Sequence, residues 1–156
     1  FQSIMIKKEL IQKIRNPFDS ESIPSEDWNF FIELSKLNPT ISYIDKPLFT
    51  WNIHDENQSL NLTKEAKALD YIINKHYDYI KAEHGLKVIA NHYRRIARIY
   101  EKKIDIINIK KFYTKAFQTY PLSIKNISYY IAIIIGYKHS KGIINFIRTL
   151  RRTPNA

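Results

Sequence analysis

The sequence contains no cysteine, and only three of its 156 residues are glycine. Without cysteine, the chain has no disulfide bonds, no thiolate metal sites and no cysteine nucleophile, and its composition fits a reducing compartment. The glycines (Gly85, Gly136 and Gly142) are too far apart to form a glycine-rich phosphate-binding loop. Two large classes of functional site are therefore excluded at the outset.

Long apolar runs are also missing. The longest extends from Ile127 to Gly136, about half of the roughly 20 residues that a membrane-spanning helix needs. The apolar run at the start of the chain is too short for a secretory signal peptide. We therefore expect a cytoplasmic chain that is soluble or lies on the inner face of the membrane.

The net charge is +10, and most of the basic residues are lysine. An AT-rich genome produces the same bias toward Ile, Lys, Asn and Tyr without any functional meaning. A basic chain can also bind nucleic acid or an anionic membrane surface. Because the charges are spread along the chain and no nucleic-acid-binding motif occurs, we expect no nucleic-acid partner. Peripheral contact with a membrane stays open.

The chain consists of two regions that differ in their predicted secondary structure. Residues 1–62 mix short strand-like segments, turns and two helices, whereas residues 63–156 follow a helical pattern almost throughout. In the first region Ser25 is a good N-cap for a helix that runs to about Leu37. The pattern there also predicts a helix over 8–15 and strands over 3–6, 41–44 and 48–54.

The second region is predicted to hold five helices, over residues 63–84, 87–102, 107–120, 123–137 and 140–151. Short links favour antiparallel neighbours. Within residues 90–121, part of the tetratricopeptide pattern occurs, carried by Ala97, Tyr100, Ala116 and Pro121. Since only one such unit is evident, we expect a repeat-like hairpin and not an array.

The last two predicted helices differ in character. The helix over 123–137 is apolar nearly all round, which is typical of a buried core helix. The helix over 140–151 combines an apolar side with several basic residues, so it could lie on a membrane surface or pack on its neighbour. We favour packing.

The stretch from Ser25 to Trp28 carries the most chemistry. Asp27 precedes Phe30 and Phe31 by three and four residues, so helical spacing predicts that it shares their apolar stripe and points into the interior or a cleft. Acidic residues in the first turn of a helix also stabilise the helix dipole. The residues alone therefore leave a purely structural role open.

Residues 1–61 resemble the acceptor-side half of family 2 glycosyltransferases. The resemblance lies in the order and spacing of short motifs: Phe18-Asp19, Glu26-Asp27-Trp28, Pro47-Leu48, the segment from Trp51 to His54, and Ser59. The chain departs from the family at Asn16-Pro17, where glycine is usual. It departs again at Glu33 and Asn52, where arginine is common.

The resemblance implies a fold and a reaction. The fold would be a mixed α/β fragment over residues 1–62, the acceptor-side half of a GT-A domain, followed by an all-α bundle over 63–156, mainly α overall. The reaction would be inverting transfer of a sugar from a nucleotide-sugar to a glycan or lipid-linked acceptor, as in the synthesis of cell-envelope polysaccharides.

The resemblance also implies roles for particular residues. Asp27 would be the general base, Glu26 would support it, and Trp28 would line the acceptor pocket. His54 would lie near the diphosphate or its metal, with Mn²⁺ or Mg²⁺ expected for the full-length enzyme. The family carries an Asp-x-Asp metal motif in its N-terminal half, and this chain has none. We therefore expect this chain to be inactive alone. The alternative is a non-catalytic helical interaction module, in which Asp27 is merely solvated.

Overall fold

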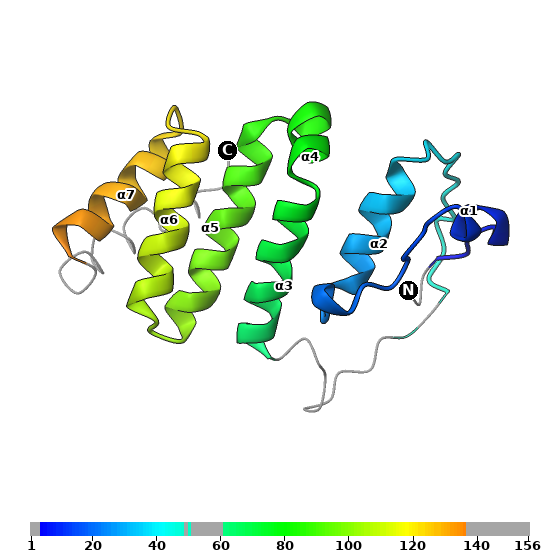
Figure 1. The fold of residues 1–156 in the computed structure, drawn as a ribbon, viewed down its shortest axis with the longest axis horizontal. Coiled ribbons are helices and arrows are strands. Elements are labelled where there is room, and N and C mark those ends of the chain that lie inside the picture. Colours follow the sequence, from blue (N-terminus) through cyan, green and yellow to red (C-terminus); the bar gives the residue numbers. More distant parts are fainter. Residues whose placement is uncertain (1–3, 49, 51–60, 137–156) are drawn as a thin grey trace. The chain divides into compact units, whose positions relative to one another are not determined.

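The computed structural model describes residues 4–48, 50 and 61–136. These residues form helices joined by turns and extended segments (Figure 1). The chain divides into two compact units, residues 1–72 and 73–156, with the division inside one helix.

No strand occurs among the described residues, so the prediction of a mixed α/β fragment is wrong for this part of the chain. The segment 41–44, predicted to be a strand, has no regular secondary structure, and neither do residues 4–6 of the predicted strand 3–6. Of the predicted strand 48–54, only Leu48 and Thr50 are described. Alternating side chains suit a strand, but its backbone groups need a neighbouring strand to bond with. Without one, Ile41 and Tyr43 are each 85 % exposed.

Among the described residues of the first unit are three short helices and the first part of a longer one. They are α1 (Lys8–Gln12), the 3₁₀ helix η1 (Ser20–Ser22), α2 (Glu26–Ser35) and α3 (Leu62–Lys75). The helix predicted over 8–15 is thus shorter than expected. The helix expected after Ser25 is confirmed and ends two residues before Leu37. The buried apolar side chains of this unit are Ile14, Phe30, Ile32, Ala66, Ala68, Leu69 and Ile72.

The second unit continues from α3 with α4 (Tyr77–His84), α5 (Leu86–Lys102), α6 (Ile106–Thr119) and α7 (Ile124–Ile135). The single helix predicted over 63–84 is interrupted at the buried His76, so it forms α3 and α4. The predicted end at residue 84 is confirmed, because Gly85 follows α4 with a φ of 77° that an L side chain rarely adopts.

Helices α5 and α6 form a hairpin, and α7 packs on α6 (Figure 1). Ala97 and Ala116 are completely buried, and small side chains of this kind let helix backbones approach closely. The ring of Tyr100 stacks on Phe112 with centroids 5.7 Å apart. Between α6 and α7, Tyr113 stacks on Tyr129 at 4.5 Å. The predicted helices over 87–102, 107–120 and 123–137 are therefore present with slightly different ends.

A buried polar network closes the C-terminal end of α6. Asn126, fully buried on α7, donates hydrogen bonds to the backbone oxygens of Ala116 (3.0 Å) and Tyr120 (2.6 Å). Its side-chain oxygen accepts a hydrogen bond from the guanidinium of Arg94 on α5. The oxygen of Ala116 also accepts the backbone N–H of Tyr120 at 3.1 Å, so Asn126 is its second donor. Because the last carbonyls of a helix have no partners within it, the hydrogen bond from Asn126 also satisfies the oxygen of Tyr120. One amide thus links three helices.

No helix in the described ranges is both long enough and apolar enough to cross a membrane.

Candidate functional site

Asp27 lies in the first turn of α2 and is exposed to solvent. Its Oδ1 accepts a hydrogen bond of 2.7 Å from the backbone N–H of Trp28. The expectation that Asp27 points inward is wrong, because the buried face of α2 is formed by Asn29, Phe30 and Ile32. At about 100° per residue, Asp27 falls roughly 60° beyond the edge of that face.

Glu26, the neighbouring acid, falls on the buried side of the same helix. It is half-buried, and its Oε2 is buried without a hydrogen-bond partner among the described residues. A buried carboxylate oxygen of this kind is costly when unbonded and is a strong acceptor for any donor that reaches it. The acidic pair therefore consists of one exposed carboxylate and one sheltered carboxylate.

The other predicted site residues divide between described and masked positions. Trp28 is half-buried beside Asp27. His54 lies outside the described residues, as do Trp51 and Ser59 of the same motifs. Within the described ranges, no three His, Asp or Glu side chains are grouped so that they could hold a metal ion.

Asp19, from the Phe18-Asp19 motif, is a key residue of the loop that leads to α2. It is 7 % exposed, and its Oδ1 accepts the backbone N–H of Glu21 at 3.1 Å. Its Oδ2 accepts the hydroxyl of Tyr71 on α3 at 2.7 Å, although the two residues are 52 positions apart in the sequence. This long-range hydrogen bond fastens the loop to α3.

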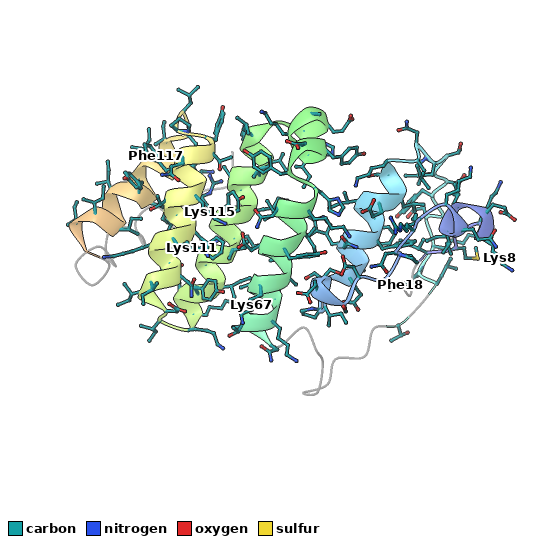
Figure 2. The ribbon with its side chains drawn as sticks, in the orientation of Figure 1. Lys8, Phe18, Lys67, Lys111, Lys115 and Phe117 are labelled. Atoms are coloured by element: carbon teal, nitrogen blue, oxygen red, sulfur yellow. The ribbon has the colours of Figure 1, made fainter. Side chains whose placement is uncertain are left out.

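The same loop is fastened to α2 by an aromatic stack. The ring of Phe18 lies parallel to that of Phe30, with centroids 5.7 Å apart. Phe18 itself is 59 % exposed and is labelled beside α2 in Figure 2. Together, the stack and the Asp19–Tyr71 hydrogen bond hold the segment that presents Glu26 and Asp27.

The hydrogen bond to Asp19 raises the pKa of Tyr71 to about 12, with smaller effects from burial and from the negative charges of Asp19, Glu21 and Glu33. Tyr71 is therefore a neutral hydrogen-bond donor at any physiological pH. Sequence reasoning missed this pair. Asp19 before Ser20 carried a local capping signal, but nothing in the sequence connected it with Tyr71.

The solvent face of α5 is a second candidate surface. Helical spacing places four cations and one amide on that face, all exposed or half-exposed: Lys87, Asn91, Arg95, Arg98 and Lys102. The only acid of α5, Glu101, accepts a hydrogen bond of 3.0 Å from the hydroxyl of Tyr113. We call these five residues the cationic face of α5.

Two further lysines cover aromatic rings of the α5–α6 hairpin. The ammonium of Lys115 lies 5.1 Å from the ring centres of both Tyr93 and Phe112, and Lys111 lies 5.3 Å from Phe112. Figure 2 shows both lysines on α6. Cations over ring faces stabilise the packing, so these two lysines have a structural role.

Comparison with known proteins adds no relative. No family model matches the chain, and neither the curated proteins nor the solved structures contain a significant match.

Proposed function

We propose that this chain supplies the acceptor-side catalytic residues of an inverting family 2 glycosyltransferase, with Asp27 as the general base. The order of its short motifs carries the proposal: an Asp loop, the Glu-Asp-Trp helix start, Pro-Leu and an aromatic-x-x-His segment. The proposal depends on these residues and not on an α/β architecture, which the described residues do not have.

In the proposed reaction, Asp27 removes the proton from an acceptor hydroxyl while the hydroxyl oxygen attacks the anomeric carbon of a nucleotide-sugar. The new glycosidic C–O bond forms as the C–O bond to the diphosphate breaks, and the nucleoside diphosphate leaves with the electron pair. The exposure of Asp27 supports this role, since a general base must come within about 3 Å of the proton it takes. Oδ1 accepts the N–H of Trp28, and no described residue donates to Oδ2.

Glu26 and Trp28 would complete the acceptor side. The sheltered oxygen of Glu26 can accept a hydrogen bond from a sugar hydroxyl or from a group that orients the acceptor. The half-buried indole of Trp28 offers an apolar face and an N–H beside the base. In the complete enzyme, Mn²⁺ or Mg²⁺ would stabilise the leaving diphosphate, and the resemblance implies that His54 would lie near the diphosphate or its metal.

The cationic face of α5 favours a site of action at a membrane. Four cations without an acid among them attract the acidic headgroups of a cytoplasmic leaflet, by about 1 kcal/mol for each basic residue near the surface. A lipid-linked acceptor would be met at that surface. We therefore propose peripheral attachment to the inner face of the membrane and cytoplasmic chemistry.

The test is turnover by the longest protein product that contains this chain. Release of nucleoside diphosphate from nucleotide-sugars is measured with Mn²⁺ or Mg²⁺ for the unaltered protein, Asp27→Asn and the control Asp45→Asn, another exposed aspartate of the first unit. We expect Asp27→Asn to lower kcat by about 10²–10⁴-fold and Asp45→Asn to leave it unchanged. Equal turnover in all three proteins would contradict the proposal and leave the helical interaction module as the working function.

A further inference from the structure

Exposed apolar side chains occur in both units. On α7, five isoleucines are between 38 % and 80 % exposed, so the expectation that the helix over 123–137 is buried on all sides is wrong. In the first unit, Phe18 is 59 % exposed, although the ring on which it stacks, Phe30, is only 1 % exposed. Phe18 differs from the isoleucines of α7, because it belongs to the segment that presents the carboxylates of Glu26 and Asp27.

One face of the Phe18 ring rests on the protein. The rings of Phe18 and Phe30 are parallel to within 7°, with centroids 5.7 Å apart. The exposed area of Phe18 therefore belongs to the edges of its ring and to its outer face. An aromatic ring face is apolar and carries a weak negative charge. It fits a flat ligand surface made of C–H groups.

The Phe18 ring is held in place before any ligand binds. Asp19, the next residue in the chain, accepts the hydroxyl of Tyr71 on α3 at 2.7 Å. The supporting ring of Phe30 is itself contacted edge-on by Phe31, with centroids 5.6 Å apart. A ligand that stacks on a ring fixed in this way loses less free energy to the ordering of side chains than one that stacks on a mobile ring.

Hydrogen-bond acceptors lie beside the stacked rings. Glu26 precedes Phe30 by four residues, and side chains at this spacing are neighbours on a helix surface. The buried Oε2 of Glu26 has no hydrogen-bond partner within the described ranges, and the adjacent Asp27 is exposed. No lysine or arginine occurs from Phe18 to Ser35, so this segment supplies no cation to pair with either carboxylate.

We propose that Phe18 is a stacking platform for a pyranose ring of the acceptor, an inference that rests on the proposed glycosyl transfer. A pyranose presents C–H groups on its two faces and hydroxyls around its rim. The C–H face packs on the outer face of Phe18, while hydroxyls donate hydrogen bonds to Oε2 of Glu26 and to the carboxylate of Asp27. A lipid chain, by contrast, would leave both carboxylates without donors.

The same geometry narrows the class of acceptor sugar. Equatorial hydroxyls leave the face of a pyranose apolar, whereas an axial hydroxyl would point toward the ring of Phe18 and lose its hydrogen bonds with water. The platform therefore favours a sugar with equatorial hydroxyls, such as a β-glucoside.

Binding of a defined saccharide tests the platform without a donor, a metal ion or turnover. Saturation-transfer difference NMR on the full chain measures binding of methyl β-glucopyranoside, with the acyclic polyol sorbitol as control ligand. We expect the glucoside to bind, with the strongest transfer at its ring C–H protons. Phe18→Leu keeps an apolar side chain on Phe30 but removes the ring face, so it should weaken binding by about three- to tenfold. Tyr43→Leu, at an exposed tyrosine of the same unit, is the matched control and should leave binding unchanged.

Three results would overturn the platform. They are an unaltered protein that does not bind the glucoside, equal binding of sorbitol and the glucoside, and equal affinity of the unaltered protein and Phe18→Leu. Urea titrations of each variant verify that it is folded under the conditions of the binding measurement.

Failure of the platform and failure of the proposed reaction give different results. If Asp27→Asn leaves turnover unchanged while Phe18→Leu weakens glucoside binding, the saccharide site stands and the assignment of the base is wrong. If Asp27→Asn abolishes turnover while Phe18→Leu binds the glucoside normally, the reaction stands and the platform is wrong.

Discussion

The hydrogen bond between Tyr71 and Asp19 makes the sharpest prediction about the first unit. Tyr71→Phe removes a single hydroxyl that donates at 2.7 Å to a carboxylate only 7 % exposed, and leaves the rest of the ring in place. Hydrogen bonds to charged groups contribute about 1.5–3 kcal/mol. Because the Tyr71 side chain is itself half-exposed, water screens part of this, and we expect a loss of about 1–2 kcal/mol.

The two tryptophans of the chain, Trp28 and Trp51, both belong to the first unit, so fluorescence reports on its unfolding. In urea titrations of the full chain, Tyr71→Phe should lower the midpoint without changing the slope. In thermal melts the loss corresponds to roughly 5–10 °C for a unit of this size. Tyr43→Phe, which alters an exposed tyrosine of the same unit, is the matched control and should leave both midpoints unchanged.

The pH dependence gives a second measurement of the same bond. Since the pKa of Tyr71 is raised from 10.0 to about 12 in the folded protein, folding holds this proton more tightly. Its stabilising contribution is complete below pH 10 and is lost as the pH rises from 10 to 12. The difference between the unaltered protein and Tyr71→Phe should therefore shrink over that interval.

A double-mutant cycle with Asp19→Ala decides whether the bond itself is responsible. If the two substitutions reduce stability independently, with no coupling beyond about 0.3–0.5 kcal/mol, the reasoning is refuted. A Tyr71→Phe protein as stable as the control would refute it equally.

Two further predictions concern the second unit. Asn126→Leu should destabilise the unit by about 2–4 kcal/mol, because it removes a partner of Arg94 and the side-chain amide that donates to the carbonyls of Ala116 and Tyr120. Thermal melts followed by circular dichroism test this, with Asn74→Ala, at an exposed position, as the control. Equal thermal midpoints for the two variants would argue against the network. Asp105→Ala should lower the thermal midpoint at pH 7, because Asp105 caps α6 through the backbone N–H of Asn108 at 3.1 Å. Hydrogen bonds from Asn108 lower the pKa of Asp105 below 3.8 in the folded protein. The difference in thermal midpoint between the unaltered protein and Asp105→Ala should therefore be complete above pH 4 and fade as the pH falls further. A difference that does not change with pH would contradict the capping role.

Several local structures could be predicted because short-range chemistry decides them. Gly85 ends a helix with a φ of 77° and a ψ of 167°, a combination that is essentially limited to glycine. Ser25 stands at the N-cap position of α2 as expected, although its side chain makes no capping hydrogen bond there. The first helix begins at Lys8 as expected, but it ends at Gln12, four residues before Asn16, so the restriction that proline places on its preceding residue does not set this end.

Other expectations failed where the outcome depends on a distant partner. The segment around Ile41 and Tyr43 has the composition of a strand, but a strand also requires a neighbouring backbone, and both side chains are exposed. The buried stripe of α2 was expected to include Asp27. In the structure the adjacent face of the helix, with Asn29 and Phe30, is buried instead. A difference of about 60° in helix rotation decides whether a carboxylate is sheltered or exposed, and periodicity over ten residues does not resolve it.

The sequence by itself determined the helical texture of residues 63–136, the positions of most helix ends, and the absence of cysteine chemistry, since all of these depend on composition and on residues a few positions apart. It also supplied the motifs on which the proposed glycosyl transfer rests. Only the tertiary structure decided that Asp27 is exposed and Glu26 sheltered, that Tyr71 fastens the Asp19 loop from 52 residues away, and that Asn126 joins three helices. These features arise from contacts between segments far apart in the chain. The free energy of such contacts depends on side-chain geometry and burial and not on local helix or strand propensity.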